Sequence, residues 1–154
     1  SATEGAQAIY GEGGADEAQN LSDYGRLYNW YAVDNAAGLC PTGWHVPTLT
    51  DFTALILYHG GESVAAGKLK SSPTDTPSWN GTNAYGWSWL PGGYRNLFGA
   101  FSSIGSYAFS WSSTSINVND SAWAIYAIGG SDYTSPSGYN KATGSSVRCL
   151  KDSD

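Results

Sequence analysis

Trp89-Leu90-Pro91-Gly92-Gly93-Tyr94-Arg95 is the stretch that decides the fold of this chain, and two later stretches, Ser110–Thr114 and Ser146–Cys149, continue its pattern. All three are dense in aromatic, glycine and hydroxyl residues and nearly free of charge. Long helices are excluded here, because glycine and serine weaken a helix and proline stops it. We therefore expect short strands joined by tight turns that need glycine. Recognition loops favour the same residue types, so this part is predicted to display a surface on a scaffold built by the first third of the chain.

Composition limits the class of protein. The 154 residues predict one domain with an ordinary core. Aromatic residues make up 14% of the chain, which excludes a disordered protein. The formal net charge of -6 argues against nucleic acid or an anionic membrane as a partner. The sequence contains no membrane span, no visible signal peptide and no methionine, so we expect no direct membrane insertion and a mature product or a piece of a larger protein.

Helical periodicity is confined to the chain before residue 70. Residues 1–23 are acidic and rich in glycine and alanine, and they are interpreted as a lead-in or linker. Leu27–Ala37 has apolar residues three and four apart, which predicts a first helix. A second helix is predicted to begin at Thr48, whose hydroxyl can cap it, with Asp51 near the positive end of the helix dipole. Ser63–Leu69 predicts one further helical turn.

The remainder of the chain predicts strands and loops. Ala122–Ile128 is the clearest strand, and Ser145–Leu150 is predicted to be the last one. Residues 129–144 have almost no aliphatic side chains and are interpreted as a long exposed loop. Two helices followed by many short strands predict an α+β fold rather than an alternating βαβ protein.

Six motifs follow one another along the chain: Tyr24–Ala32, Cys40–Thr48, Gly60–Ala65, Leu90–Arg95, Trp111–Thr114 and Ser146–Cys149. Their content and their order are similar to those of the Fibrobacter succinogenes major paralogous domain, over residues 24–151. One departure is conservative, since Asp51-Phe52 stands where Glu-Trp is common in the family.

This resemblance implies a C-type-lectin-like fold, in which two helices pack on short, mostly antiparallel strands with long loops. It also implies a non-catalytic display domain that binds a ligand or receptor. Related domains occur in phage fibres and in secreted or surface-anchored bacterial proteins, and some are varied by diversity-generating retroelements. The implied setting is therefore extracellular, at a phage fibre tip on the virion or in a bacterial cell-surface adhesin, as part of a larger chain or assembly. The implied partner is a host-surface protein or a glycan.

Two other functions remain open at this stage. The domain could be a structural decoration or cap within a larger extracellular assembly. It could also be a degenerate enzyme of the related formylglycine-generating type, although no second cysteine lies near Cys149 to supply that chemistry.

The candidate ligand contacts lie between the motifs, at positions that correspond to the variable stretches of the family. They are Phe98, Ser102, Ser103, Tyr107, Phe109, Asn117, Asn119, Tyr126, Tyr133, Tyr139 and Asn140. The alternative for each aromatic residue among them is a place in the core. Exposed aromatic side chains gathered on one face would mark a binding site.

Cofactor and catalytic signals are weak. We expect no cofactor, although the side-chain oxygens of Asn117, Asn119, Asp120 and Asp132 could ligate calcium, with turn capping as the alternative. We expect no catalytic residues and no other metal site, because the chain lacks a Gly-x-Ser-x-Gly elbow and a paired-carboxylate pattern.

The resemblance also implies a disulfide between Cys40 and Cys149, with two buried free thiols in a reducing compartment as the alternative. His45 is expected to form a hydrogen bond inside the core. His59 is expected at a helix end, where a partial positive charge is favourable. Several motif residues, namely Trp44, Trp89, Trp111, Trp123 and Arg95, are expected to belong to the scaffold. Arg95 in particular is predicted to be buried and held by carbonyl groups or a carboxylate.

Overall fold

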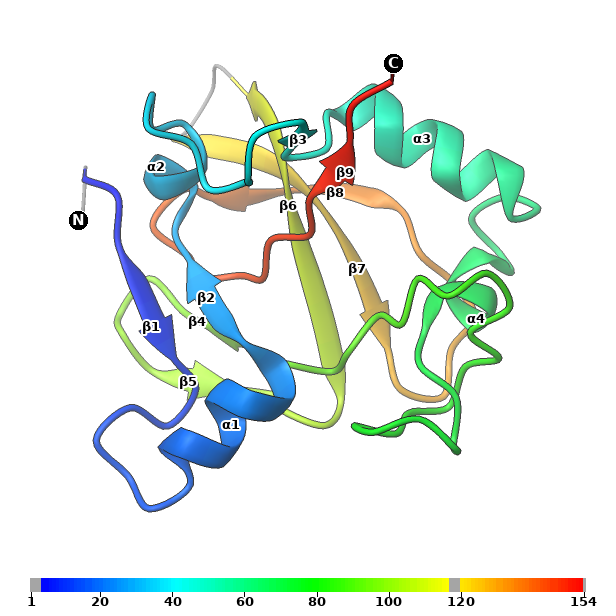
Figure 1. The fold of residues 1–154 in the computed structure, drawn as a ribbon, viewed down its shortest axis with the longest axis horizontal. Helices are drawn as coiled ribbons and strands as arrows, with labels where there is room; N and C mark the ends of the chain where they lie inside the picture. Colours follow the sequence, from blue (N-terminus) through cyan, green and yellow to red (C-terminus); the bar gives the residue numbers. More distant parts are fainter. Residues whose placement is uncertain (1–3, 117–119, 154) are drawn as a thin grey trace.

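The computed structural model describes residues 4–116 and 120–153 and has an α+β fold (Figure 1). The helices are α1 (Glu17–Tyr24), α2 (Trp30–Val33), α3 (Leu49–Tyr58) and α4 (Ala65–Leu69). The strands are β1 (Gln7–Ile9), β2 (Arg26–Tyr28), β3 (Trp44–His45), β4 (Tyr94–Arg95), β5 (Phe101–Ser102), β6 (Tyr107–Ile116), β7 (Ser121–Ile128), β8 (Pro136–Asn140) and β9 (Leu150–Lys151). Antiparallel pairing joins β1 to β2, β3 to β9, β4 to β5, and β7 to both β6 and β8.

The sheet β6-β7-β8 divides the core into two parts (Figure 1). Successive side chains of a strand point to opposite faces. Ala108 and Ile125 lie on the face that packs against α3 and α4, with Phe52 of α3 in the same buried cluster. Trp111 lies on the opposite face and packs against Trp30 of α2. The predicted strand Ala122–Ile128 is confirmed as β7, one residue longer at its start.

Local sequence accounts for α3, which confirms the predicted second helix. The Thr48 hydroxyl accepts a hydrogen bond from the Asp51 amide, and the Asp51 carboxylate accepts one from the Thr48 amide. This capping box satisfies amide groups that a helix start otherwise leaves unpaired. The helix ends before Gly60 and Gly61, whose φ angles of 102° and 93° favour glycine. α4 confirms the further turn predicted within Ser63–Leu69.

The predicted helix over Leu27–Ala37 is wrong for most of its length. The stretch begins as part of β2, and only the four residues of α2 are helical. Asn29 sets the boundary, because its side-chain oxygen accepts hydrogen bonds from the backbone amides of both Ala6 and Ala32. It thereby caps α2 and ties it to the chain just before β1. Pairing with a distant strand overrides the helical spacing of the sequence.

The acidic segment before Tyr24 differs from the interpretation as a linker. It contributes β1, which pairs with β2, and the eight-residue helix α1. Ala8 and Ile9 of β1 are buried, and the ring of Tyr10 lies 5.2 Å from that of Phe101 on β5. The segment has too few apolar residues to show a periodic pattern. Its residues Ala8 and Ile9 are buried because β1 pairs with β2.

Residues 129–144 are not a loop throughout, which corrects the prediction. Pro136–Asn140 forms β8, whose Tyr139 lies opposite Ala122 of β7. Before it, Thr134 is fully buried and its amide donates a hydrogen bond to the carbonyl of Glu62. This strand was missed because half of it faces away from the core and its sequence holds no aliphatic residue.

The last part of the chain returns to the scaffold, although mostly through isolated bridges rather than the predicted strand over Ser145–Leu150. Ser145 bridges Tyr28, Ser146 bridges Ser110, and only β9 forms a ladder, with β3. Cys40 and Cys149 form a disulfide with Cα atoms 5.8 Å apart, as the resemblance implied. Structural disulfides persist in oxidising compartments, so the bridge fits an extracellular or secreted protein. Within the described residues, no helix is long and apolar enough to cross a membrane.

Gly93 shows why the stretch Trp89–Arg95 needs glycine. Its φ is 65°, and a Cβ atom placed on it would lie 2.4 Å from the Ser102 carbonyl oxygen. No other residue fits such an approach without moving the backbone. This tight turn lets β4, which consists of Tyr94 and Arg95, pair with β5. Both residues are half-buried there.

Candidate ligand-binding surface

Aromatic rings cover one face of the sheet β6-β7-β8. Phe109 lies opposite Tyr126 in the β6-β7 register, with ring centroids 6.4 Å apart. Tyr139 of β8 meets Phe109 edge-on at 5.3 Å, and Tyr107 stacks on Phe109 at 6.1 Å. Tyr94 of β4 packs against the same ring at 5.2 Å. Ring pairs at these separations stabilise each other, so the rings form one preorganised group.

A hollow of about 380 Å³ opens beside this group. The rings of Tyr94, Phe109 and Tyr139 line it, together with the polar residues Asn96, Asn140 and Thr143. We call it the aromatic hollow. Its described lining contains no charged side chain. Such a surface offers apolar contact area and a few amide and hydroxyl groups, which suits an uncharged, partly polar ligand group.

The structure brings only some of the predicted contacts to the aromatic hollow. Phe109, Tyr139 and Asn140 line it, but Phe109 is only 8% exposed and belongs mainly to the core. Tyr107 and Tyr126 are half-buried within the same group of rings. Tyr133 extends the group, since its ring lies 6.3 Å from that of Tyr126 and is exposed.

The remaining predicted contacts lie apart from the aromatic hollow. Phe98 is 87% exposed at the tip of the turn between β4 and β5. Ser102 and Ser103 are half-buried at the end of β5, where their hydroxyl groups lie 3.1 Å apart. Neither serine is among the described residues that line the hollow. Asn117 and Asn119 fall outside the described residues.

Of the four calcium candidates, only Asp120 and Asp132 lie within the described residues, and these two do not meet. Asp120 immediately precedes β7 and Asp132 follows it, so the length of this eight-residue strand separates their carboxylates. The Asp120 carboxylate accepts a hydrogen bond from the Tyr31 hydroxyl at 2.6 Å. Among the described residues, no three histidine, cysteine, aspartate or glutamate side chains are placed to hold a metal ion.

The scaffold predictions have mixed outcomes. Trp89 and Trp111 are buried as expected, and Trp123 is half-buried. Trp44 belongs to the scaffold as the first residue of β3, but it is 45% exposed. It pairs with Lys151 of β9, and that two-residue ladder offers too little cover for an indole ring.

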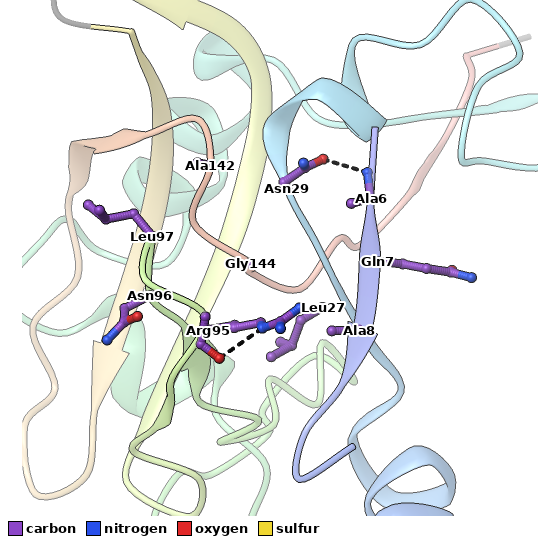
Figure 2. Close-up of a pocket in the computed structure, with 11 residues that line it drawn as sticks. Ala6, Gln7, Ala8, Leu27, Asn29, Arg95, Asn96, Leu97, Ala142 and Gly144 are labelled. Atoms are coloured by element: carbon purple, nitrogen blue, oxygen red, sulfur yellow. Dashed lines mark hydrogen bonds between the residues drawn. The ribbon is translucent and has the colours of Figure 1, made fainter. Parts of the chain in front are cut away.

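Arg95 is held by a carbonyl group, as predicted, but it is not fully buried (Figure 2). It is half-buried, and its Nε donates a hydrogen bond to the Gly99 carbonyl at 3.0 Å. Its guanidinium lies over the Phe101 ring at 5.2 Å. Within residues 4–116 and 120–153 no carboxylate pairs with it. The cation is therefore at the edge of the scaffold rather than beneath it.

Comparison with known proteins identifies the domain. A family model described as the Fibrobacter succinogenes major domain matches residues 4–151. The chain belongs to this family. No curated protein and no solved structure is detectably similar to it.

In this Fibrobacter succinogenes major domain, three motifs meet around the central sheet. The Gly93 amide donates to the Tyr107 carbonyl, and the Trp111 amide donates to the Ser146 carbonyl at 3.0 Å. The family match begins at residue 4, so β1 and α1 lie within it. Sequence reasoning missed Tyr94, Asn96 and Thr143 as lining residues. For Tyr94 the sequence does contain a signal, because the residue directly follows Gly92-Gly93 and a turn there can place its ring beside the variable stretches. The sequence contains no such signal for Asn96 or Thr143.

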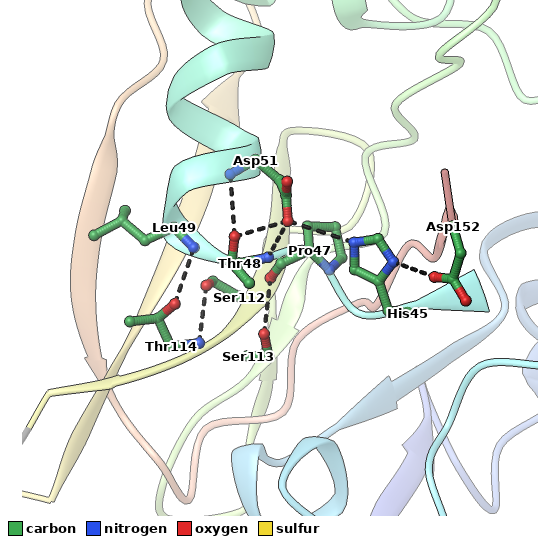
Figure 3. A network of polar contacts seen from close by, with 9 residues as sticks. All are labelled: His45, Pro47, Thr48, Leu49, Asp51, Ser112, Ser113, Thr114 and Asp152. Atoms are coloured by element: carbon green, nitrogen blue, oxygen red, sulfur yellow. Dashed lines mark hydrogen bonds and ion pairs between the residues drawn. The ribbon is translucent and has the colours of Figure 1, made fainter. Parts of the chain in front are cut away.

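His45 is at the surface instead of in the core (Figure 3). Its Nδ1 lies 2.6 Å from the Asp152 carboxylate and its Nε2 lies 3.4 Å from that of Asp51. The hydrogen bond with Asp152 raises the pKa of His45, desolvation opposes the change, and Asp51 adds to it. β3 has only two residues and is too short to bury the ring. Through Asp51 and Asp152, the histidine links the cap of α3 to the segment after β9.

This arrangement predicts a pH-dependent contribution to stability. Because the pKa of His45 is higher in the folded than in the unfolded state, its contribution is complete below about pH 6.5, the usual pKa of histidine. It is lost as the pH rises through the folded-state pKa. We expect the free energy of unfolding of wild type to exceed that of His45→Gln by less than about 1 kcal/mol, since the pair is exposed.

Urea unfolding of both proteins at pH 5 and pH 8.5 measures this difference. The difference should shrink toward zero at the higher pH, and one that stays constant would contradict the assignment. Both proteins retain His59, so its titration cancels.

Two basic side chains, His59 and Lys70, are buried. His59 caps the end of α3, but it is 3% exposed, and burial followed by the nearby Lys68 charge lowers its pKa. Desolvation thus overrides the favourable helix end. Lys70 is fully buried, and its Nζ donates to the Ser131 carbonyl at 2.7 Å. Desolvation lowers the pKa of Lys70, opposed by Asp132. Nothing in the sequence indicates that Lys70, a single lysine at the end of the short helix α4, is buried.

Proposed function

We propose that this domain is a non-catalytic binding module that presents the aromatic hollow to a ligand or receptor outside the cell. One observation carries the proposal: rings from β4, β6 and β8, far apart in sequence, converge on a hollow that also exposes amide and hydroxyl groups. Aromatic rings give rigid contact area at a low cost in conformational entropy, and such rings dominate the energy of many interfaces.

The finer setting is part of the same proposal. The fold is of the C-type-lectin-like kind, and the domain stands at a phage fibre tip or in a bacterial surface adhesin, where it meets a host-surface protein or a glycan. Family membership, the resemblance of the motif order and the disulfide support this setting. Phe98 and Tyr133 are exposed, so both can vary without disturbing the core.

Substitution of a lining ring tests the proposal. Tyr139→Ala should weaken binding by about 2 kcal/mol or more, roughly 30-fold in affinity, because the ring is a central contact of the aromatic hollow. The measurement is the binding of the labelled domain to immobilised neutral and acidic glycans and to whole bacterial cells. Thermal melting of each variant reports separately on the fold.

Tyr58→Ala is the matched control, since Tyr58 is a tyrosine of α3 that is 75% exposed and does not line the aromatic hollow. It should bind as wild type does. Unchanged binding by a folded Tyr139→Ala variant would refute the proposed surface.

A structural role is the second candidate, and the apolar surface of α3 favours it. Leu57 is 68% exposed, and Tyr58 meets Tyr85, which is 61% exposed, at a ring separation of 5.7 Å. Clustered exposed apolar side chains mark contact surfaces. If the domain is a decoration or cap module, Tyr58→Ala should weaken incorporation into the assembly and Tyr139→Ala should have no effect. The same two variants therefore separate the two functions.

A further inference from the structure

Arg95 faces a second hollow, of about 160 Å³, between β1 and the turn that follows β4 (Figure 2). Asn96 and Leu97 line both this hollow and the aromatic hollow, so the two are neighbours. In Figure 2 the Arg95 side chain extends toward Leu27 and Ala8. Arg95 is the one charged residue among the described residues of the lining.

The guanidinium group has unused hydrogen-bonding capacity. Its Nε donates to the Gly99 carbonyl at 3.0 Å. Across the part of the chain that the structure describes, neither terminal nitrogen has a hydrogen-bond partner, and no carboxylate lies within 4.0 Å. An arginine side chain carries five N–H donors in a fixed planar arrangement. The four N–H donors on the two terminal nitrogens are therefore available to a bound group.

The surroundings fix the orientation of this cation. The Gly99 carbonyl holds Nε from one side, and the Phe101 ring lies 5.2 Å from the guanidinium. Gly99 also lies next to the guanidinium, since a Cβ atom added there would be in ordinary van der Waals contact with Nη2 at 3.5 Å. A guanidinium held in place in this way loses little entropy when it binds, and its geometry matches two oxygens of a carboxylate.

The opposite wall of the hollow is small and uncharged. Ala6, Ala142 and Gly144 contribute no side chain that could reach across and neutralise the guanidinium. The net charge of -6 does not prevent anion binding, because charges beyond about 8 Å are largely screened at physiological salt. The hollow thus combines an oriented cation, free donors and room for a small anionic group.

We propose that the Arg95 hollow binds a carboxylate group, carried by an acidic sugar or by the C-terminus of a peptide. Arg95 forms a bidentate ion pair with it, while the remainder of the ligand stays outside. This site goes beyond the proposed function, since it uses none of the rings of the aromatic hollow. Substitution of Tyr139 therefore leaves this site intact, and a failure of one proposal does not affect the other.

NMR titration of the ¹⁵N-labelled domain tests the proposal. The probes are glucuronic acid and N-acetylglycine, with glucose as the uncharged probe and sodium sulfate as the second anion. Loss of a signal in Arg95→Lys assigns the Arg95 Nε–H resonance. This resonance should shift in a saturable way with both carboxylates and not with glucose, and the tighter carboxylate identifies the source. Arg95→Gln should lower the affinity at least tenfold, as followed by shifts of the Gly99 and Gly144 amides.

Two further variants keep the test decisive. Ala6→Leu fills the hollow from an exposed position without removing Arg95, and it should also lower the affinity at least tenfold. Lys141→Gln removes a cation next to Ala142 and should change the affinity less than twofold. Equal saturable shifts with sulfate would show an adventitious ion only and overturn the proposal. The absence of saturable shifts with both carboxylates would also overturn the proposal. The same holds if Lys141→Gln lowers the affinity for the carboxylates as much as Arg95→Gln does.

Discussion

Replacement of both Cys40 and Cys149 by serine is expected to lower the free energy of unfolding by about 4–5 kcal/mol. The bridge joins residues 109 positions apart, so in its absence the unfolded chain regains the entropy of a very long loop. In the folded state the bridge fastens the chain after α2 to the entry of β9. Total stabilities of single domains are about 5–15 kcal/mol, so the double variant should be close to unfolding at elevated temperature. Urea unfolding at 25 °C measures the change.

Reduction provides the matched control for this prediction. Dithiothreitol should destabilise wild type by the same amount and leave the double-serine variant unchanged. Neither cysteine lines the aromatic hollow, so the folded double variant should bind as wild type does. A loss of less than about 1 kcal/mol would show that other contacts already constrain these two segments.

Sequence predicts those parts of the fold whose causes are local. α3 is the clearest case, because its cap, its buried stripe of Phe52 and Ile56, and its glycine stop lie within thirteen residues of one another along the chain. β7 was equally readable, since its aliphatic residues are bounded by turn residues. In both segments local preference and tertiary packing agree, which makes the pattern reliable.

The errors occur where a distant partner decides the local structure. Leu27 belongs to a strand because β1 pairs with it, although its spacing to Trp30 and Tyr31 is helical. The sequence of β8 predicts a loop because Ser137 and Gly138 have weak strand preference, yet β7 offers an open edge on which Tyr139 can bury its ring. A sequence alone does not contain the position of these partners, so propensity gave the wrong answer.

The candidate surface was predictable in kind but not in detail. Tyr107 and Phe109 alternate along β6 and mark one face of a sheet, which the residues themselves indicate. Whether such a ring is core or surface depends on what covers it. Phe109 is covered by Tyr94, a residue assigned to a motif and not to the display positions. Arg95 is the opposite case, a residue predicted to be buried that is half-exposed. Among the described residues, no carboxylate forms an ion pair with its guanidinium.

Removal of the Trp111 side chain is expected to be among the most destabilising single substitutions in this domain. Trp111 is completely buried on the β6 face that packs against α2, in a cluster with Trp30, Val33 and Ala122. Its Nε1 donates a hydrogen bond to the Tyr28 carbonyl at 2.8 Å, which joins β6 to the end of β2. Trp111→Ala should cost about 3–5 kcal/mol, from lost burial and the cavity that remains.

Two variants separate the sources of this cost. Trp111→Phe keeps most of the apolar contact but removes one of the two hydrogen bonds that the Tyr28 carbonyl accepts, the other coming from the Ser145 amide. The lost hydrogen bond should cost about 1 kcal/mol. Trp44→Ala removes an indole that is 45% exposed, and it should cost less than about 1 kcal/mol, as surface substitutions do. Urea unfolding of the three variants and wild type gives the comparison. If Trp111→Ala proves no more destabilising than Trp44→Ala, the packing of β6 against α2 and β2 does not make the large contribution to stability that we expect.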